Sequence, residues 1–212
     1  LDRAIPFGQR VSDAQFFKAL ALIQLNDISG ALKALGEVGP STNYGRALQE
    51  AAAILVSQGD IGAANAFFEE HRQVHADGAE LNFALHAETL QTLGSIEAES
   101  VLSRGIDAFP TSTRLLFARA NFRERAGFFD LAEADYRRIL SLNPGDANAL
   151  NALGYALTNN TDRFQEAAGL LEEAISKDPR NPAIIDSRGW VYFKLGKDRQ
   201  AELLLKEAYK QY

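Results

Sequence analysis

An alanine recurs along this chain at intervals of 33, 34, 34, 35 and 34 residues, and each is followed four positions later by one large apolar or aromatic residue. The six pairs are Ala31 and Leu35, Ala64 and Phe68, Ala98 and Leu102, Ala132 and Tyr136, Ala167 and Leu171, and Ala201 and Leu205. Pro110, Pro144 and Pro179 each follow their alanine by 12 residues. This period is typical of a helix–turn–helix solenoid, in which stacked repeats bury each other's apolar faces.

Glycine and proline indicate where the helices cross and end. A glycine inside a helix costs roughly 1 kcal/mol relative to alanine. Gly154 and Gly189 are therefore expected where a second helix, carrying Ala167 or Ala201, passes too close for a side chain. Asn-Pro and Asp-Pro pairs mark helix boundaries. The expected helix pairs are 12–25/28–38, 43–58/61–74, 79–93/96–108, 113–126/129–141, 147–159/164–177 and 182–195/198–211.

The last three copies resemble the tetratricopeptide repeat (TPR). The fifth copy carries the resemblance at Leu150, Leu153, Gly154, Ala167, Leu171, Ala174 and Pro179. The sixth repeats it at Ile185, Gly189, Tyr192, Gly196, Ala201, Leu205 and Ala208. Copies one to three are looser, with Ala19, Ala52 and His86 in place of the glycine. The resemblance implies an all-α TPR solenoid of about six helix-turn-helix repeats forming a right-handed superhelix.

We expect a lead-in segment, 1–11, followed by one TPR array, 12–212. The expected repeats are 12–39, 43–77, 79–110, 113–144, 147–179 and 182–212. The chain begins at Leu1 without a signal peptide and contains no methionine, which favours a fragment of a longer array over a mature form. No apolar run approaches the 18 residues of a transmembrane helix. The absence of cysteine excludes disulfides and thiolate chemistry.

The formal net charge of −6 is uneven, because residues 1–110 carry 7 basic and 14 acidic side chains, whereas residues 111–212 carry 15 and 14. An acidic array is poorly suited to a phosphate backbone, so we expect no nucleic-acid partner. Known catalytic and phosphate-binding motifs are absent from the sequence. His71 and His75 have a metal-ligand spacing but no third ligand nearby, which favours ordinary packing. We therefore expect no enzyme activity, no metal and no cofactor.

By the TPR resemblance, the first helix of each pair lines a concave groove that binds a partner protein or peptide. The partner-binding residues expected in copies four to six are Arg114, Phe117, Asn121, Arg125, Asn148, Asn151, Tyr155, Asn159, Asp186, Trp190 and Lys194. Asparagine can pair with any peptide backbone, and Tyr, Trp and Arg are enriched at interfaces. The corresponding positions of copy two include Gln49, Ala53 and Val56, and those of copy three are Glu80, Phe83, Ala87, Leu90 and Gln91. A chaperone-tail carboxylate clamp is incomplete, because Phe117 and Ala183 stand where cations are expected.

A narrower resemblance covers Asn151–Arg163 and Asp186–Tyr192. These stretches resemble the signature of the Gram-negative outer-membrane TPR lipoprotein that binds and activates a C-terminal-processing protease (LbcA type). The resemblance implies a noncatalytic adaptor on the periplasmic side of the outer membrane. Its partners would be the protease and the cell-wall hydrolases that the protease degrades. Membrane attachment would occur only through a lipid anchor outside this chain.

Two alternatives remain open. The first is a cytoplasmic TPR scaffold for secretion or chaperone complexes. The second is a structural module that self-assembles as a homo-oligomer through its terminal helix. On that helix Ala201, Leu205 and Ala208 are expected to face the preceding helix. Leu203 or Leu204, with Tyr209 and Tyr212, would then be left without a neighbour, so we expect further helices after Tyr212 or pairing of the fragment through this end.

Overall fold

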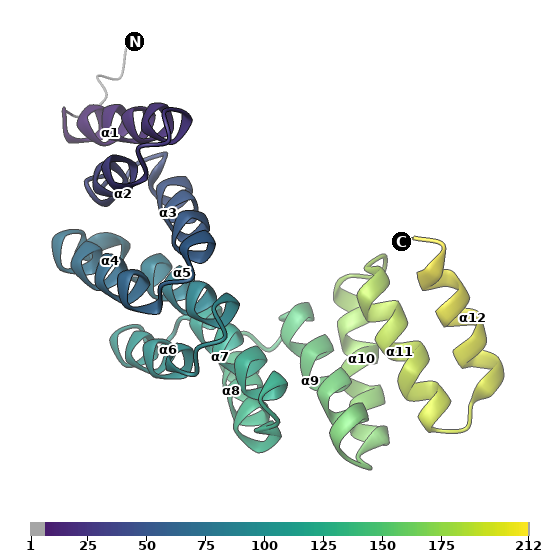
Figure 1. Cartoon of the computed structure of the whole chain (residues 1–212). Coiled ribbons are helices and arrows are strands. Elements are labelled where there is room, and N and C mark those ends of the chain that lie inside the picture. The colour runs from purple at the N-terminus through teal and green to yellow at the C-terminus, as the bar shows by residue number, and fades with distance from the viewer. Residues whose placement is uncertain (1–6, 212) are drawn as a thin grey trace, which may run out of the picture. The chain divides into compact units, whose positions relative to one another are not determined.

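The computed structural model describes the backbone of residues 7–211 and the side chains of residues 10–211, and this part of the chain contains helices and turns without a strand. The first six α-helices and one short 3₁₀ helix are α1 Phe7–Gln24, α2 Ile28–Gly36, α3 Tyr44–Gln58, α4 Ile61–Val74, η1 Ala76–Gly78, α5 Ala79–Thr92 and α6 Glu97–Ala108. The remaining helices are α7 Thr113–Arg125, α8 Phe129–Leu142, α9 Ala147–Asn160, α10 Phe164–Lys177, α11 Pro182–Lys194 and α12 Asp198–Tyr209. This alternation confirms the predicted all-α helical repeat (Figure 1).

The chain divides into two compact units, the first ending at Leu115 and the second beginning at Leu116. In the first unit, the core around α1, α2 and α3 is built on buried residues such as Phe16, Leu35 and Ile54. In the second unit, Leu150, Ala174 and Ile184 form a buried cluster that joins α9, α10 and α11. Neighbouring repeats therefore share their cores, as a solenoid requires.

The repeat anchors are buried as the spacing predicts. All six alanines, from Ala31 to Ala201, are at most 2% exposed. The large residue four positions later is fully buried in five copies, and Leu205 in the sixth is half-buried. The difference at Leu205 arises because its side chain lines an open apolar cavity beside α12.

The start of the first helix differs from the expectation. Helix α1 begins at Phe7, so residues 7–11 of the expected lead-in segment are helical. Residues 1–6 of that segment lie outside the described residues. The other boundaries agree within a few residues, because most carry local end signals. Asp60 and Asp146, for example, accept hydrogen bonds at the starts of α4 and α9 from the backbone N–H of Ala63 (2.9 Å) and Ala149 (3.0 Å).

The turns between paired helices use two solutions. In the fourth copy Gly127 adopts the left-handed conformation with φ of 83°, and in the first copy Asn26 replaces glycine with φ of 59°. Asparagine tolerates this region better than other non-glycine residues. The fifth copy uses the other solution. Thr161, the residue after α9, adopts an extended conformation, and its hydroxyl donates to Leu157 O (2.8 Å).

Candidate functional site

Two glycines bring first and second helices of the same repeat into close contact. A Cβ atom on Gly154 of α9 would lie 2.7 Å from Leu171 Cγ of α10 and 3.2 Å from the backbone oxygen of Ala167. A Cβ atom on Gly189 of α11 would lie 2.8 Å from Leu205 Cγ of α12. The glycines leave room for the second helices behind α9 and α11, and other positions of these two helices carry the residues that the sequence assigned to a partner.

Trp190 is held across two repeats at the α9–α11 contact. Its indole Nε1–H donates to Asn159 Oδ1 (2.9 Å), which joins the ends of the two first helices. The ring of Phe193 stacks on Trp190 at 5.5 Å with an interplanar angle of 20°. Lys194 Nζ lies 5.0 Å from the centroid of the Trp190 ring, within cation–π range. We name Asn159, Trp190, Phe193 and Lys194 the Trp190 cluster.

The Trp190 cluster presents apolar area and polar groups together. Phe193 is 52% exposed and Asn159 and Lys194 are also exposed, whereas Trp190 is half-buried. A ring that is already fixed by a hydrogen bond and a stacked neighbour loses little conformational entropy when a partner covers it. The structure therefore brings together Asn159, Trp190 and Lys194, three of the predicted partner-binding residues, with Phe193, a further groove position of the sixth copy.

Further predicted residues share α9 with this cluster. Tyr155 is 43% exposed, and Asn148 at the start of the helix is exposed. Asn151, one turn before Tyr155, is half-buried, and its Oδ1 atom is shielded from solvent without a hydrogen-bond partner among the described residues. On α11, Asp186 lies one turn before Trp190 and is half-buried. An unsatisfied amide oxygen is unfavourable, so Asn151 is a natural acceptor for a donor brought by a ligand.

The predicted residues of the fourth copy have structural contacts instead. Phe117 meets the Tyr136 ring edge-on at 5.8 Å, and the Tyr136 hydroxyl lies 2.8 Å from Asn121 Oδ1 and 2.9 Å from Glu124 Oε2. Burial and the neighbouring Glu124 carboxylate raise the pKa of Tyr136, so its hydroxyl stays protonated. Arg125 is exposed, as is Arg114, which lies in the first unit. Phe117 and Asn121 thus position Tyr136 inside the repeat.

The third copy departs from the predicted groove positions. Ala87 and Leu90 are fully buried, and Phe83 packs under the Arg72 guanidinium at 4.3 Å. The cause is Gly105 on α6, where an added Cβ would lie 2.9 Å from Phe83 Cγ. In this copy the small residue sits on the second helix, because His86 occupies the usual glycine position of the first helix.

A cavity of about 240 Å³ nevertheless lies between α3 and α5. It is lined by Gln49, Ala52, Ala53 and Val56 from α3 and by Leu85, Glu88, Thr89 and Thr92 from α5. Gln49, Ala53 and Val56 are therefore at a groove as the spacing predicts, but the assignment on α5 was wrong for Phe83, Ala87 and Leu90. The cavity is lined by both polar and apolar side chains, and it suits contact with a ligand or polypeptide.

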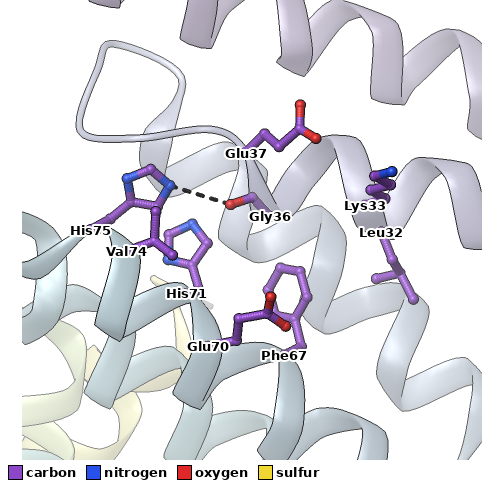
Figure 2. Close-up of a pocket in the computed structure, with 9 residues that line it drawn as sticks. All are labelled: Leu32, Lys33, Gly36, Glu37, Phe67, Glu70, His71, Val74 and His75. Atoms are coloured by element: carbon purple, nitrogen blue, oxygen red, sulfur yellow. Dashed lines mark hydrogen bonds between the residues drawn. The ribbon is translucent and has the colours of Figure 1, made fainter.

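A larger cavity, of about 540 Å³, lies between the second helices α2 and α4. Figure 2 shows Phe67 and His71 at its wall and His75 directed at the backbone oxygen of Gly36, at 3.3 Å from Nε2. The rings of Phe67 and His71 are stacked at 5.8 Å. His71 Nε2 also lies 3.1 Å from Val38 O, so both histidines hydrogen-bond to the backbone that leaves α2.

A buried polar network in the first unit was not anticipated from the sequence. Arg72 Nη1 donates to Asn82 Oδ1 and lies 3.1 Å from His86 Nδ1, while Arg72 Nη2 is 2.8 Å from the Glu69 carboxylate. Burial, and then the adjacent Arg72, lower the pKa of His86 to about 3. Burial, and then the neighbouring His75, lower the pKa of His71 to about 4. His71 and His86 are thus neutral packing groups near neutral pH.

No group of three or more His, Cys, Asp or Glu residues within residues 10–211 has a geometry that could hold a metal ion. None of the helices described between Phe7 and Tyr209 is long and apolar enough to cross a membrane. The arrangement at α9 and α11 is one of exposed aromatic rings, amides and one cation, which suits contact with a polypeptide.

Comparisons with known proteins agree with this architecture. A family model described as tetratricopeptide repeat matches residues 117–182. Over 187 residues the chain is 31% identical to TPR repeat-containing protein PA4667 of Pseudomonas aeruginosa. The matched region covers 88% of this chain and 32% of that protein. The chain therefore spans about a third of the length of this relative.

Solved structures show the same fold at low sequence identity. A tetratricopeptide repeat protein from Parabacteroides merdae has a TM-score of 0.63 at 18% identity, covering 95% of this chain and 80% of that chain. MamA from Desulfovibrio magneticus has a TM-score of 0.62 at 14% identity, covering 78% and 93%. YrrB, described as a TPR protein with an unusual peptide-binding site, has a TM-score of 0.57 at 18% identity, covering 77% and 84%. This chain therefore has the helical-repeat fold of these tetratricopeptide repeat structures.

Proposed function

We propose that this chain is a noncatalytic interaction scaffold that binds an extended or helical segment of a partner protein at α9 and α11. The main support for this proposal is the Trp190 cluster. In it, a hydrogen bond to Asn159 of the preceding repeat fixes the indole ring beside the exposed Phe193. Aromatic anchors of this kind contribute much of the free energy at protein interfaces. Tyr155 and Asn151, on α9 with Asn159, extend the surface along that helix.

The polar groups of this surface suit a peptide backbone. The Asn151 Oδ1 atom lacks a hydrogen-bond donor among the described residues, and a peptide N–H would supply one after a small side-chain rotation. Asn148 and Asn159 offer both donor and acceptor groups, so they can pair with a backbone of any sequence. Lys194 beside the Trp190 ring adds a charged group that favours an acidic residue in the partner.

We further propose that the partner is a C-terminal-processing protease and its cell-wall hydrolase substrates, with the chain acting as a periplasmic adaptor held at the outer membrane by a lipid anchor outside this chain. The support is the resemblance of Asn151–Arg163 and Asp186–Tyr192 to lipoproteins of that role. Three residues of the resemblance, Asn151, Tyr155 and Trp190, belong to the proposed binding surface. The binding surface and the identity of the partner are separate claims, and each has its own test.

The test of the surface uses peptides selected from a random display library against the 212-residue chain. Substituting Asn151, Tyr155 and Trp190 together by Ala should weaken the selected peptides at least tenfold in a titration, about 1.4 kcal/mol or more. Phe128→Ala is the matched control, because Phe128 is a 53% exposed ring of the same unit outside α9 and α11. Equal affinity for the parent and the triple variant, at unchanged helicity, would disprove the surface.

The test of the partner is a titration with the C-terminal-processing protease of the organism that encodes this chain. Binding of the protease by the parent chain, and its loss in the triple variant, would support both claims. Absence of binding to the protease, while selected peptides still require the Trp190 cluster, would overturn the adaptor role and leave the scaffold in place.

A further inference from the structure

An open apolar cavity lies along one flank of α12, where it adjoins α11. The cavity, of about 750 Å³, is lined by Phe193 of α11 and by Ala201, Leu205 and Tyr209 of α12. Tyr209 is 82% exposed and Phe193 52% exposed. Leu203 is also exposed, whereas Leu204 is half-buried against Gly189, so the leftover apolar side chains are Leu203 and Tyr209. Tyr212, which the sequence also left without a neighbour, lies outside the described residues.

Four charged side chains line the same cavity at intervals of four residues. They occur in the order acid, acid, base, base along the helix: Asp198, Glu202, Lys206 and Lys210. The four-residue interval places them in one row beside the apolar floor. Glu202 and Lys206 form an ion pair with each other within the helix, and both side chains are well exposed. The row is therefore negative in its first half and positive in its second.

This charge order is complementary to itself when two copies of α12 run antiparallel. Asp198 of one copy then faces Lys210 of the second, and Glu202 faces Lys206 of the second. Both pairings have the same midpoint, position 204, so a single two-fold axis satisfies all four contacts. A parallel arrangement would place like charges opposite each other. A surface that is complementary to itself under a two-fold rotation is what a closed homodimer requires.

We propose that this flank of α12 binds a second copy of this chain in an antiparallel two-fold pairing centred at residue 204. The apolar floor supplies the burial, with Tyr209 of each copy covering the cavity of the other. The charged row fixes direction and register, because complementary charges favour one orientation and penalise the others. Self-association through α12 would bring two copies of the proposed partner surface on α9 and α11 into one assembly.

The test is sedimentation velocity of the 212-residue chain over a range of concentrations. The parent should convert from monomer to dimer as concentration rises. Asp198→Lys with Glu202→Lys should weaken the dimer at least tenfold, and so should Lys206→Glu with Lys210→Glu, because each places like charges across the axis. An equimolar mixture of the two variants should restore dimers of one copy of each.

Two controls separate this pairing from other effects. Asp130→Lys with Glu173→Lys makes the same charge change at exposed positions of α8 and α10 and should leave dimerisation unchanged. Tyr209→Ser should weaken the dimer without altering the charge row. A parent that stays monomeric at every concentration, or charge-reversed variants that dimerise like the parent, would overturn the proposal. A mixture that remains monomeric would overturn the antiparallel register.

Discussion

At the scale of single residues, two glycines in the middle of one helical hairpin have opposite surroundings. Gly154 in α9 faces Leu171 and the backbone of Ala167, and an added Cβ would be 2.7 Å from the nearest carbon atom. Gly169 in α10 is exposed, and an added Cβ there would have no neighbour within 4 Å. The intrinsic helix preference favours substitution at both positions, so packing alone decides the difference between them.

Gly154→Leu is therefore expected to lower the free energy of unfolding by roughly 1–3 kcal/mol, because it forces α9 and α10 apart in a well-packed core. Gly169→Leu serves as the control and should be neutral or stabilising by up to about 1 kcal/mol. Urea denaturation followed by circular dichroism measures both. If the two variants unfolded at the same urea concentration, the close approach of α9 and α10 at Gly154 would be refuted.

At the scale of elements, two of the acidic residues of α8, Asp135 and Glu133, lie in very different environments. The Asp135 carboxylate, 5% exposed, accepts two hydrogen bonds from Arg119 (2.8 and 2.9 Å) and one from Arg123 (2.9 Å), both on α7. Glu133, two residues earlier, pairs with Arg137 and with Arg163 at the start of α10, and both arginines are more than 40% exposed. The hydrogen bonds from Arg163 and Arg137 lower the pKa of Glu133.

Asp135→Asn should cost about 3–5 kcal/mol, because it leaves two shielded guanidinium groups without their counter-charge. Glu133→Gln should cost about 1 kcal/mol or less, because Arg137 and Arg163 keep Glu166 and reach water. Thermal or urea unfolding of the two variants, at low and at 0.5 M salt, measures the contrast. Salt should reduce only the Glu133 effect, and similar costs for the two substitutions would contradict this account of α8.

Most helices could be predicted from the sequence because their end signals are local. Asp146 before α9, Asn181-Pro182 at α11 and Gly127 after α7 act within a few residues of the boundary they set. Helix α1 was placed too late, because the residues from Phe7 to Val11 carry no such signal and continue the helix. The repeat spacing does not specify distances between side chains, so it cannot predict which side chains contact each other. The hydrogen bond from Tyr136 to Asn121, and the close approach of Gly105 to Phe83, are of this kind.

For the candidate site, the spacing identified the helix face but not the role of each residue on it. Asn159 and Trp190 were predicted separately, and the hydrogen bond that joins them across two repeats is a property of the folded chain. The buried network of Arg72, Asn82 and His86 was missed because the repeat pattern marks His86 only as an unusual residue at a glycine position. The available signal was His86 itself, a polar residue at a position that packs against a neighbouring helix. Because buried polar groups are usually hydrogen-bonded, His86 could have predicted polar partners nearby.

At the scale of the whole molecule, the two units differ in how they should respond to acid. All three histidines lie in the first unit, and the only tryptophan lies in the second. Burial lowers the pKa of His71 to about 4 and that of His86 to about 3, below the ordinary value of 6.5. The charged groups near His71 are His75 and Arg72, and those near His86 are Arg72, Glu69 and Arg104.

The sign of the effect follows from proton binding. Between pH 6.5 and the lower folded values, the unfolded chain binds protons at these histidines and the folded chain does not. The free energy of unfolding therefore falls as the pH decreases through this window. At pH 5 the loss is about 2 kcal/mol for each histidine. The carboxylates with lowered pKa, such as Glu133 and Glu166, keep their stabilising effect down to pH 4.5, so they do not contribute above pH 5.

We therefore predict that lowering the pH from 7.5 to 5 destabilises the first unit selectively. In urea titrations, the Trp190 fluorescence transition should keep its midpoint, whereas the circular dichroism transition, which reports all helices, should broaden toward lower urea. Such separation is expected in a repeat array, where stability is a sum of local terms. Gly154→Leu in the second unit provides the converse control, because it should lower the Trp190 midpoint at both pH values. Parallel shifts of both signals on acidification would show that the buried histidines do not carry the effect.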